Sequence, residues 1–108
     1  MGRYTEAVRG GHAVADAPSH ERWEVHYEGH VQGVGFRYTA RWIAARLDVT
    51  GYVKNLPDGR VRLVIEGEPA ELERMLEAID KALGRYIVRT TRETGPPSGQ
   101  FEGFDIRF

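Results

Sequence analysis

The sequence contains no cysteine among its 108 residues. This absence excludes a disulfide scaffold, a thiolate metal site and a thiol nucleophile, because each of these needs a cysteine sulfur. The only serines are Ser19 and Ser98, and both fall in segments that we expect to be tail or loop. Covalent catalysis through sulfur is therefore excluded, and catalysis through an activated serine is disfavoured.

Long apolar runs and an excess of one charge are also absent. Without an apolar run, and with no hydrophobic segment of the signal-peptide type before His20, we expect neither a membrane partner nor export, and the cytoplasm is the default location. Lysine and arginine number 15 against 16 acidic residues, and the formal net charge is −1. Because these charges are scattered evenly, we expect no nucleic-acid partner, and we expect a monomer.

What remains is enough for one small domain. Hydrophobic residues make up 41% of the chain, which suffices for a single core without disulfide bonds or structural metal ions. Residues 1–20 show no sustained hydrophobic period, so we expect a disordered N-terminal extension there. We expect the folded domain to span residues 21–108.

Hydrophobic periodicity predicts five strands and two helices in the order βαββαββ. The predicted strands are 23–31, 49–55, 60–67, one from about 86, and 104–108, and the predicted helices are 36–47 and 69–83. Each helix carries one apolar stripe, so both should cover one face of a sheet. The predicted fold class is α+β: a ferredoxin-like sandwich with an antiparallel sheet of about five strands and two helices on one face.

The segment GHVQGVGFR, residues 29–37, joins the first predicted strand to the first helix. Gly33 and Gly35 allow the backbone to turn so that consecutive N–H groups point into one concavity, as in phosphate-binding nests. Arg37 opposes the helix macrodipole unless an anion is bound beside it, and its planar fork can hold two phosphate oxygens. A glycine-containing connection followed by a solvated arginine fits these local facts equally well.

The segment does not match better-known phosphate motifs. No GxxxxGK[ST] run exists, and GVGFRY lacks the third glycine of a dinucleotide fingerprint. A thiolate phosphatase loop would need a cysteine where Val31 stands. Nucleotide-binding folds and thiol phosphatases are therefore disfavoured.

GHVQGVGFR followed by GYVKNLPDGRV, at Gly51 to Val61, resembles the paired sequence signature of the acylphosphatases. The resemblance extends from about Trp23 to Phe108. It implies a metal-independent, cofactor-free hydrolase that cleaves the carboxyl-phosphate bond of small acyl phosphates, with Arg37 and Asn55 as catalytic residues. It further implies that backbone amides of the loop bind the substrate phosphate, and the residues concerned are Gln32, Gly33, Val34, Gly35 and Phe36.

The residues present suit that chemistry. An acyl phosphate expels a carboxylate whose conjugate acid has a pKa of about 4, so no general acid is needed. The loop amides and Arg37 would stabilise the phosphoryl charge, while Asn55 would orient a water for in-line attack and the substrate phosphate would accept its proton. The alternative for Asn55 is a local bond that caps the hairpin turn.

Other polar residues have plainer interpretations. His26 and His30 lie four apart on a strand, roughly 13 Å from one another, which is too far to share one metal ion. Asp58 should serve the hairpin turn. We expect the acidic face of the second helix to be solvated, and its members are Glu71, Glu73, Glu77 and Asp80.

One departure from the family pattern concerns substrate access. The family usually has a Gly-Pro loop before the fourth strand, whereas KALGRYIV has no proline there and GPP occurs later. We expect this altered connection after Leu83 to border the active edge. Two rival functions remain: a domain like that of the hydrogenase-maturation carbamoyltransferases, and a noncatalytic phosphate-binding or RNA-binding module.

Overall fold

The computed structural model of the protein describes residues 20–108. Its elements are β1 (Glu21–Gly29), α1 (Phe36–Ala44), β2 (Thr50–Asn55), β3 (Val61–Gly67), α2 (Pro69–Leu83), the short 3-10 helix η1 (Gly84–Tyr86), β4 (Ile87–Gly95) and β5 (Phe104–Arg107). The predicted order of strands and helices is confirmed. The expected disorder of residues 1–20 lies, except for His20, outside the described residues.

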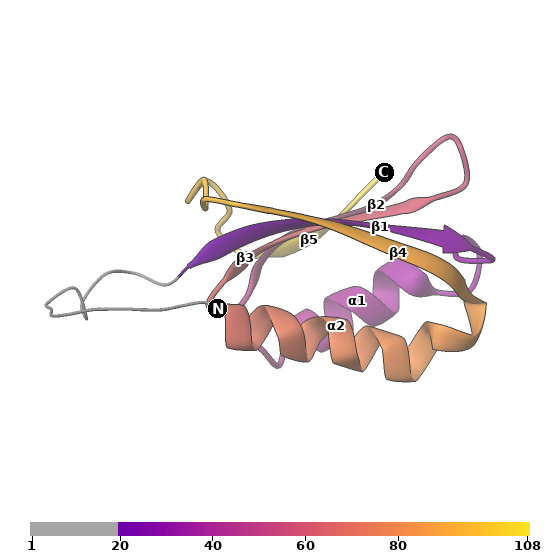
Figure 1. Ribbon diagram of the computed structural model, residues 1–108, viewed down its shortest axis with the longest axis horizontal. Helices are drawn as coiled ribbons and strands as arrows, with labels where there is room; N and C mark the ends of the chain where they lie inside the picture. The colour runs from indigo at the N-terminus through magenta and orange to yellow at the C-terminus, as the bar shows by residue number, and fades with distance from the viewer. Residues whose placement is uncertain (1–19) are drawn as a thin grey trace, which may run out of the picture.

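The five strands form one sheet in the order β4-β1-β3-β2-β5, and both helices cover the same face of it (Figure 1). This is the ferredoxin-like α+β sandwich expected from the sequence. One detail of the expectation needs correction: the sheet is mixed, because β5 pairs parallel to β2 while the other pairs are antiparallel. The chain leaves β4 at one edge and crosses the end of the sheet to the other edge, so β5 runs in the same direction as its new neighbour.

The core lies between the sheet and the two helices. Alternate residues of the central strands β1 and β3 face the helices, as period-two alternation requires. The buried helix residues are Phe36, Ala40, Ile43 and Ala44 of α1 and Leu72, Met75, Ile79 and Leu83 of α2. Helix α1 packs against β2 and β5, and its first residue, Phe36, lies close to Asn55 at the end of β2.

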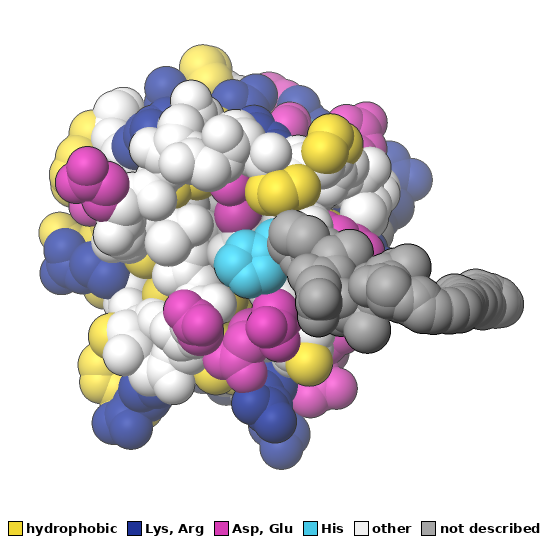
Figure 2. All heavy atoms as spheres, turned by 90° about the vertical axis from the view of Figure 1, so that its left-hand side faces the viewer, with side chains coloured by type: hydrophobic (Ala, Val, Ile, Leu, Met, Phe, Trp, Pro, Cys, Tyr) yellow, Lys and Arg dark blue, Asp and Glu magenta, His cyan; other side chains and the backbone are white. Residues whose placement is uncertain are grey.

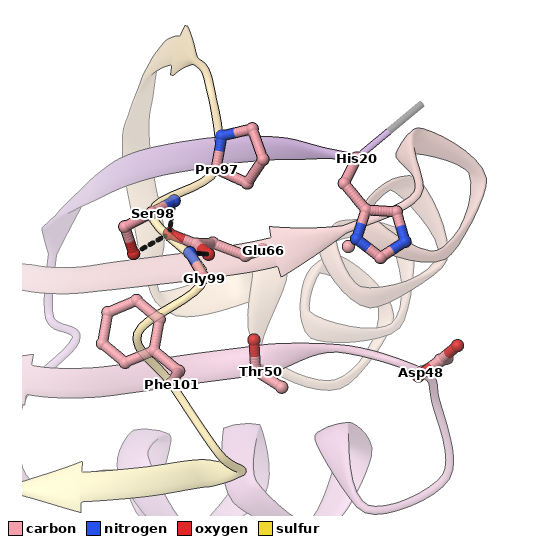
Figure 3. Close-up of a pocket in the computed structure, with 9 residues that line it drawn as sticks. His20, Asp48, Thr50, Glu66, Pro97, Ser98, Gly99 and Phe101 are labelled. Carbon is pink, nitrogen blue, oxygen red and sulfur yellow. Dashed lines mark hydrogen bonds between the residues drawn. The ribbon is translucent and has the colours of Figure 1, made fainter. Parts of the chain in front are cut away.

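The segment that crosses from β4 to β5 is held by Glu66 of β3, which is only 5% exposed. Its carboxylate accepts hydrogen bonds from Ser98 N–H (2.9 Å), Ser98 Oγ (2.7 Å) and Gly99 N–H (3.0 Å), as Figure 3 shows. Arg22 Nη1 lies 3.4 Å from the same carboxylate. Burial raises the pKa of Glu66, but these hydrogen bonds outweigh burial and hold it below its ordinary value.

Figure 2 views the molecule from this crossover end, where acidic and basic side chains are interspersed. That distribution agrees with the even scatter of charge along the sequence. None of the described helices has the length and apolar character needed to cross a membrane.

Candidate active site

The sheet register brings Asn55 to the start of the glycine-containing loop. Tyr27 of β1 and Asn55 of β2 both pair with Val61, one on each side of β3. Because β1 and β2 are both antiparallel to β3, their carboxyl ends meet at one end of the sheet (Figure 1). The structure therefore places Asn55 beside the segment that follows β1, as the predicted topology requires.

The loop between β1 and α1 contains two glycines at positive φ and leads to an uncapped helix N-terminus. Gly33 and Gly35 have φ angles of 83° and 80°, which are accessible to glycine at little cost. Gly35 is the N-cap of α1, where no side chain caps the helix and the first turn contains no acidic residue. The backbone N–H groups of this first turn therefore have no side-chain cap, and uncapped helix N-termini are where proteins commonly bind anions.

A pocket of about 240 Å³ opens at this position. Its lining residues are Val31, Gly33, Gly35, Phe36, Arg37, Tyr38 and Asn55. Arg37 is half-buried, and its guanidinium lies over the ring of the C-terminal Phe108. The larger pocket of about 390 Å³ in Figure 3 lies at the crossover end of the sheet and is lined neither by the loop between β1 and α1 nor by Arg37.

The side chains of two of the predicted phosphate-binding residues, Gln32 and Val34, point away from the pocket. The side chain of Val34 packs against the core, and the amide of Gln32 donates to Leu56 O (2.8 Å) and Arg60 O (2.9 Å) in the β2–β3 hairpin. Neither residue lines the pocket. Any contact of these two residues with a phosphate would therefore involve their backbone N–H groups.

Asn55 supplies an unusual polar atom to the pocket. Its Oδ1 is buried, and no donor among residues 20–108 reaches it. The hairpin turn is closed without it, by Leu56 N–H to Arg60 O (2.8 Å) and Gly59 N–H to Leu56 O (3.1 Å). The turn-capping alternative for this atom is thus not observed, and a buried acceptor without a partner costs about 1–3 kcal/mol.

Neighbouring titratable groups do not offer a general base. Tyr27 is buried beneath the site and its ring lies 4.9 Å from that of Phe36. Burial, with a smaller contribution from the charge of Asp80, raises the pKa of Tyr27 well above its ordinary value, so the phenol stays neutral. Tyr27 does not line the pocket; among residues 20–108, the titratable side chains that do are those of Arg37 and Tyr38.

The remaining polar candidates lie elsewhere. His26 Nε2 lies 3.7 Å from Glu24 Oε2 and 3.4 Å from Arg62 Nε. Within residues 20–108, no group of three or more histidine or acidic side chains could hold a metal ion. The predicted turn role of Asp58 is confirmed, because its carboxylate accepts hydrogen bonds from the backbone N–H and Nε of Arg60.

Sequence reasoning missed two side chains at the site, Tyr38 and Phe108. Tyr38 directly follows Arg37, but only the structure shows that it lines the pocket while remaining 57% exposed. Phe108 reaches Arg37 because β5 lies beside β2, which periodicity alone does not reveal.

The altered connection after Leu83 does border this region, as predicted. The carbonyl of Tyr86, in η1, accepts a hydrogen bond from His30 N–H at 2.9 Å. The connection is therefore attached to the first residue of the glycine-containing loop.

Comparison with known proteins is consistent with this geometry. The family model described as acylphosphatase matches residues 23–106. The acylphosphatase of Archaeoglobus fulgidus is 39% identical over 85 residues, which cover 79% of this chain and 96% of that protein. The crystal structure of acylphosphatase from Bacillus subtilis is 28% identical with a TM-score of 0.75, and the match covers 82% of this chain and 99% of that one.

A second kind of relative is larger. The crystal structure of T. kodakarensis HypF is 32% identical with a TM-score of 0.71. The match covers 82% of this chain but only 12% of HypF. The likeness to HypF is therefore confined to one part of a longer protein.

Proposed function

The chain belongs to the acylphosphatase family, a hydrolase family acting on acyl phosphates, and from this premise we propose how its own residues carry out the reaction. The backbone N–H groups of residues 32–36, which form the phosphate cradle, and the guanidinium of Arg37 hold the phosphoryl oxygens. Amides at a helix N-terminus and a planar guanidinium suit a phosphate group in both charge and shape. The bound anion also relieves the unfavourable position of Arg37 in the first turn of α1.

The leaving group needs no proton from the enzyme. Cleavage releases a carboxylate whose conjugate acid has a pKa of about 4, so it departs as the anion near neutral pH. This agrees with a pocket whose described lining contains no carboxyl group or histidine. Catalysis then rests on positioning and on stabilisation of the phosphoryl charge.

The observation that carries the proposal is the buried, unpartnered Oδ1 of Asn55. A water that donates a hydrogen bond to this oxygen is oriented with a lone pair available for attack on phosphorus. An amide is too weak a base to remove the proton of that water, so the proton goes to an oxygen of the substrate phosphate. The P–O bond to the carboxylate breaks as the bond from water to phosphorus forms.

Further parts of the proposal concern the form in which the enzyme works. Residues 21–108 are the catalytic domain and act as a monomer in the cytoplasm, without metal, cofactor or nucleic acid. The even distribution of charge supports the absence of a nucleic-acid partner. Size-exclusion chromatography, cell fractionation and the activity of a chain that begins at Glu21 test these points.

The rival functions make different predictions. A noncatalytic module binds phosphate or RNA without releasing phosphate from benzoyl phosphate. A domain that acts only inside a larger enzyme also gives no independent turnover. Membership of the acylphosphatase family favours hydrolysis over both.

The direct test is the initial rate of phosphate release from benzoyl phosphate in the presence of EDTA, for the parent and for Asn55→Ala. We expect chelator-insensitive turnover by the parent, and a loss of about 10²-fold or more in kcat for Asn55→Ala because its water is no longer oriented. Inhibition by inorganic phosphate should be unchanged, because the cradle is intact. Gln100→Ala, at an exposed side-chain amide, is the control, and full activity of Asn55→Ala contradicts the water-positioning role.

A further inference from the structure

Gln32 joins the two halves of the site. It lies in the loop between β1 and α1, yet its side chain reaches residues 24 and 28 positions further along the chain. Its Nε2 donates to Leu56 O at 2.8 Å and to Arg60 O at 2.9 Å, which lie on the two sides of the hairpin turn. Leu56 directly follows Asn55, so this contact holds the backbone next to the residue that carries the unpartnered oxygen.

Both N–H donors of the Gln32 amide are used in these bonds. The side chain therefore has no N–H left for a phosphate oxygen. This argues against the simplest interpretation of Gln32 as a substrate ligand through its side chain. Its function must instead depend on what the two bonds hold in place.

Each of the two segments that Gln32 connects has an anchor of its own, because Val31 is buried in the core and Asn55 pairs with Val61 in the sheet, but Gln32 adds side-chain hydrogen bonds between them. Gly33 and Gly35, both at positive φ, follow it in the loop, and the hairpin beyond Asn55 is a turn closed by local bonds. A displacement of about 1 Å between reacting groups can cost about 10²-fold in rate. A hydrogen-bonded connection between the loop and the hairpin therefore restricts how far the distance between the cradle and Asn55 can vary.

We propose that Gln32 is a positioning residue that fixes Asn55 relative to the phosphate cradle. The proposal rests on the function described above, in which Asn55 orients the attacking water. The side chain of Gln32 then acts on the chemical step through Asn55, whereas phosphate binding uses only the backbone N–H of this residue. It contributes to kcat only while Asn55 is present.

The hydrogen-bond partners of the Gln32 side chain decide which substitution to test. Gln32→Met keeps the length of the side chain but removes both donors. The two carbonyls keep one partner each, because Leu56 O still accepts from Gly59 N–H and Arg60 O still accepts from Leu56 N–H. Folding should therefore survive. Gln100→Met is the matched control at an exposed glutamine.

A double-mutant cycle on the full chain tests the proposal with benzoyl phosphate as substrate and inorganic phosphate as inhibitor. In the parent background we expect Gln32→Met to lower kcat by about tenfold, through misplacement of Asn55. In the Asn55→Ala background the same change should alter kcat by less than about twofold, because there is nothing left to position. The inhibition constant for phosphate should stay within about threefold of the parent value, since the cradle amides and Arg37 remain.

Other outcomes would overturn the proposal. If the effects of the two substitutions multiply in the double mutant, Gln32 has a general structural role independent of Asn55. If Gln32→Met weakens phosphate inhibition and leaves kcat unchanged, Gln32 is a substrate ligand. If the parent itself shows no turnover, the proposed function fails and the role of Gln32 fails with it. If the parent is active, either of the first two outcomes rejects only the positioning role of Gln32.

Discussion

The ring of Phe108 lies over the guanidinium of Arg37, with 4.6 Å between Cζ and the ring centroid. Phe108 is the last residue of the chain and is 85% exposed, so it buries little surface on its own. A guanidinium stacked on a ring has one face covered, while its N–H groups point outward in its plane. The contact therefore restrains Arg37 from one side, and a guanidinium held in this way can still donate to phosphate oxygens.

This relationship predicts a modest kinetic effect of Phe108→Ala. Loss of an exposed cation–π contact is worth about 0.5–1 kcal/mol, which corresponds to a decrease of about two- to fivefold in kcat/KM for benzoyl phosphate. Thermal stability should hardly change. Val88→Ala, at a similarly exposed apolar residue, is the control, and equal kinetics for Phe108→Ala and Val88→Ala would rule out restraint of Arg37 by the ring.

Arg37→Lys tests whether the planar fork matters or only the positive charge. Lysine keeps the charge but cannot hold two phosphate oxygens in one plane. We expect kcat/KM to fall by about 10²–10³-fold, the loss typical of removing one essential charge-stabilising donor. Arg41→Lys on the exposed face of α1 is the matched control and should retain activity. Near-parental activity of Arg37→Lys would mean that charge alone suffices.

Gly35→Ala tests the geometry of the cradle. Its φ of 80° is unfavourable for alanine, although an added Cβ would meet no atom within 4 Å. The cost is therefore backbone strain of about 1–2 kcal/mol rather than a clash. We expect a lower unfolding free energy and weaker inhibition by phosphate, as the loop amides turn away. Gly95→Ala, which also has free space but no positive φ, should change neither property.

The buried carboxylate of Glu66 predicts a pH dependence of stability. Because its folded-state pKa lies below its unfolded value of about 4.3, its charge stabilises the fold above that value. The stabilisation is lost as the pH falls through the lower folded-state pKa. Urea unfolding of Glu66→Gln should show a deficit of about 1–3 kcal/mol at pH 7 that shrinks toward pH 3.

Glu102→Gln, at an exposed glutamate, is the control for that experiment. The site lies at the opposite end of the sheet from Glu66, so folded Glu66→Gln protein should keep its kinetic constants. A stability deficit that is the same at pH 7 and pH 3 would contradict ionic anchoring of the crossover segment by Glu66.

Much of the fold could be predicted because its signals are local. Alternation in β1 and β3 and the apolar stripes of both helices identify the elements and the face that each buries. The direction of β5 could not be predicted in the same way. It depends on where the chain arrives after crossing the sheet, and that path is fixed by hydrogen bonds from Ser98 and Gly99 to Glu66, more than 30 residues away in sequence.

The site also has features that could be predicted from local sequence and features that could not. The positive φ of Gly33 and Gly35 and the proximity of Asn55 to the loop follow from glycine chemistry and strand order, both of which the sequence contains. The side-chain direction of Gln32 could not be predicted from the sequence. Its partners are backbone carbonyls, which every residue type has. The position of Phe108 over Arg37 likewise depends on the direction and pairing of β5.

The central claim is that water attacks phosphorus. The most direct test is to hydrolyse benzoyl phosphate in H₂¹⁸O and find which product carries the ¹⁸O. We predict that mass spectrometry of the products will find one ¹⁸O in each inorganic phosphate and none in benzoate, once the spontaneous reaction has been subtracted. Label in benzoate would show that water attacks the acyl carbon instead, and would contradict a site built from a phosphate cradle, Arg37 and Asn55.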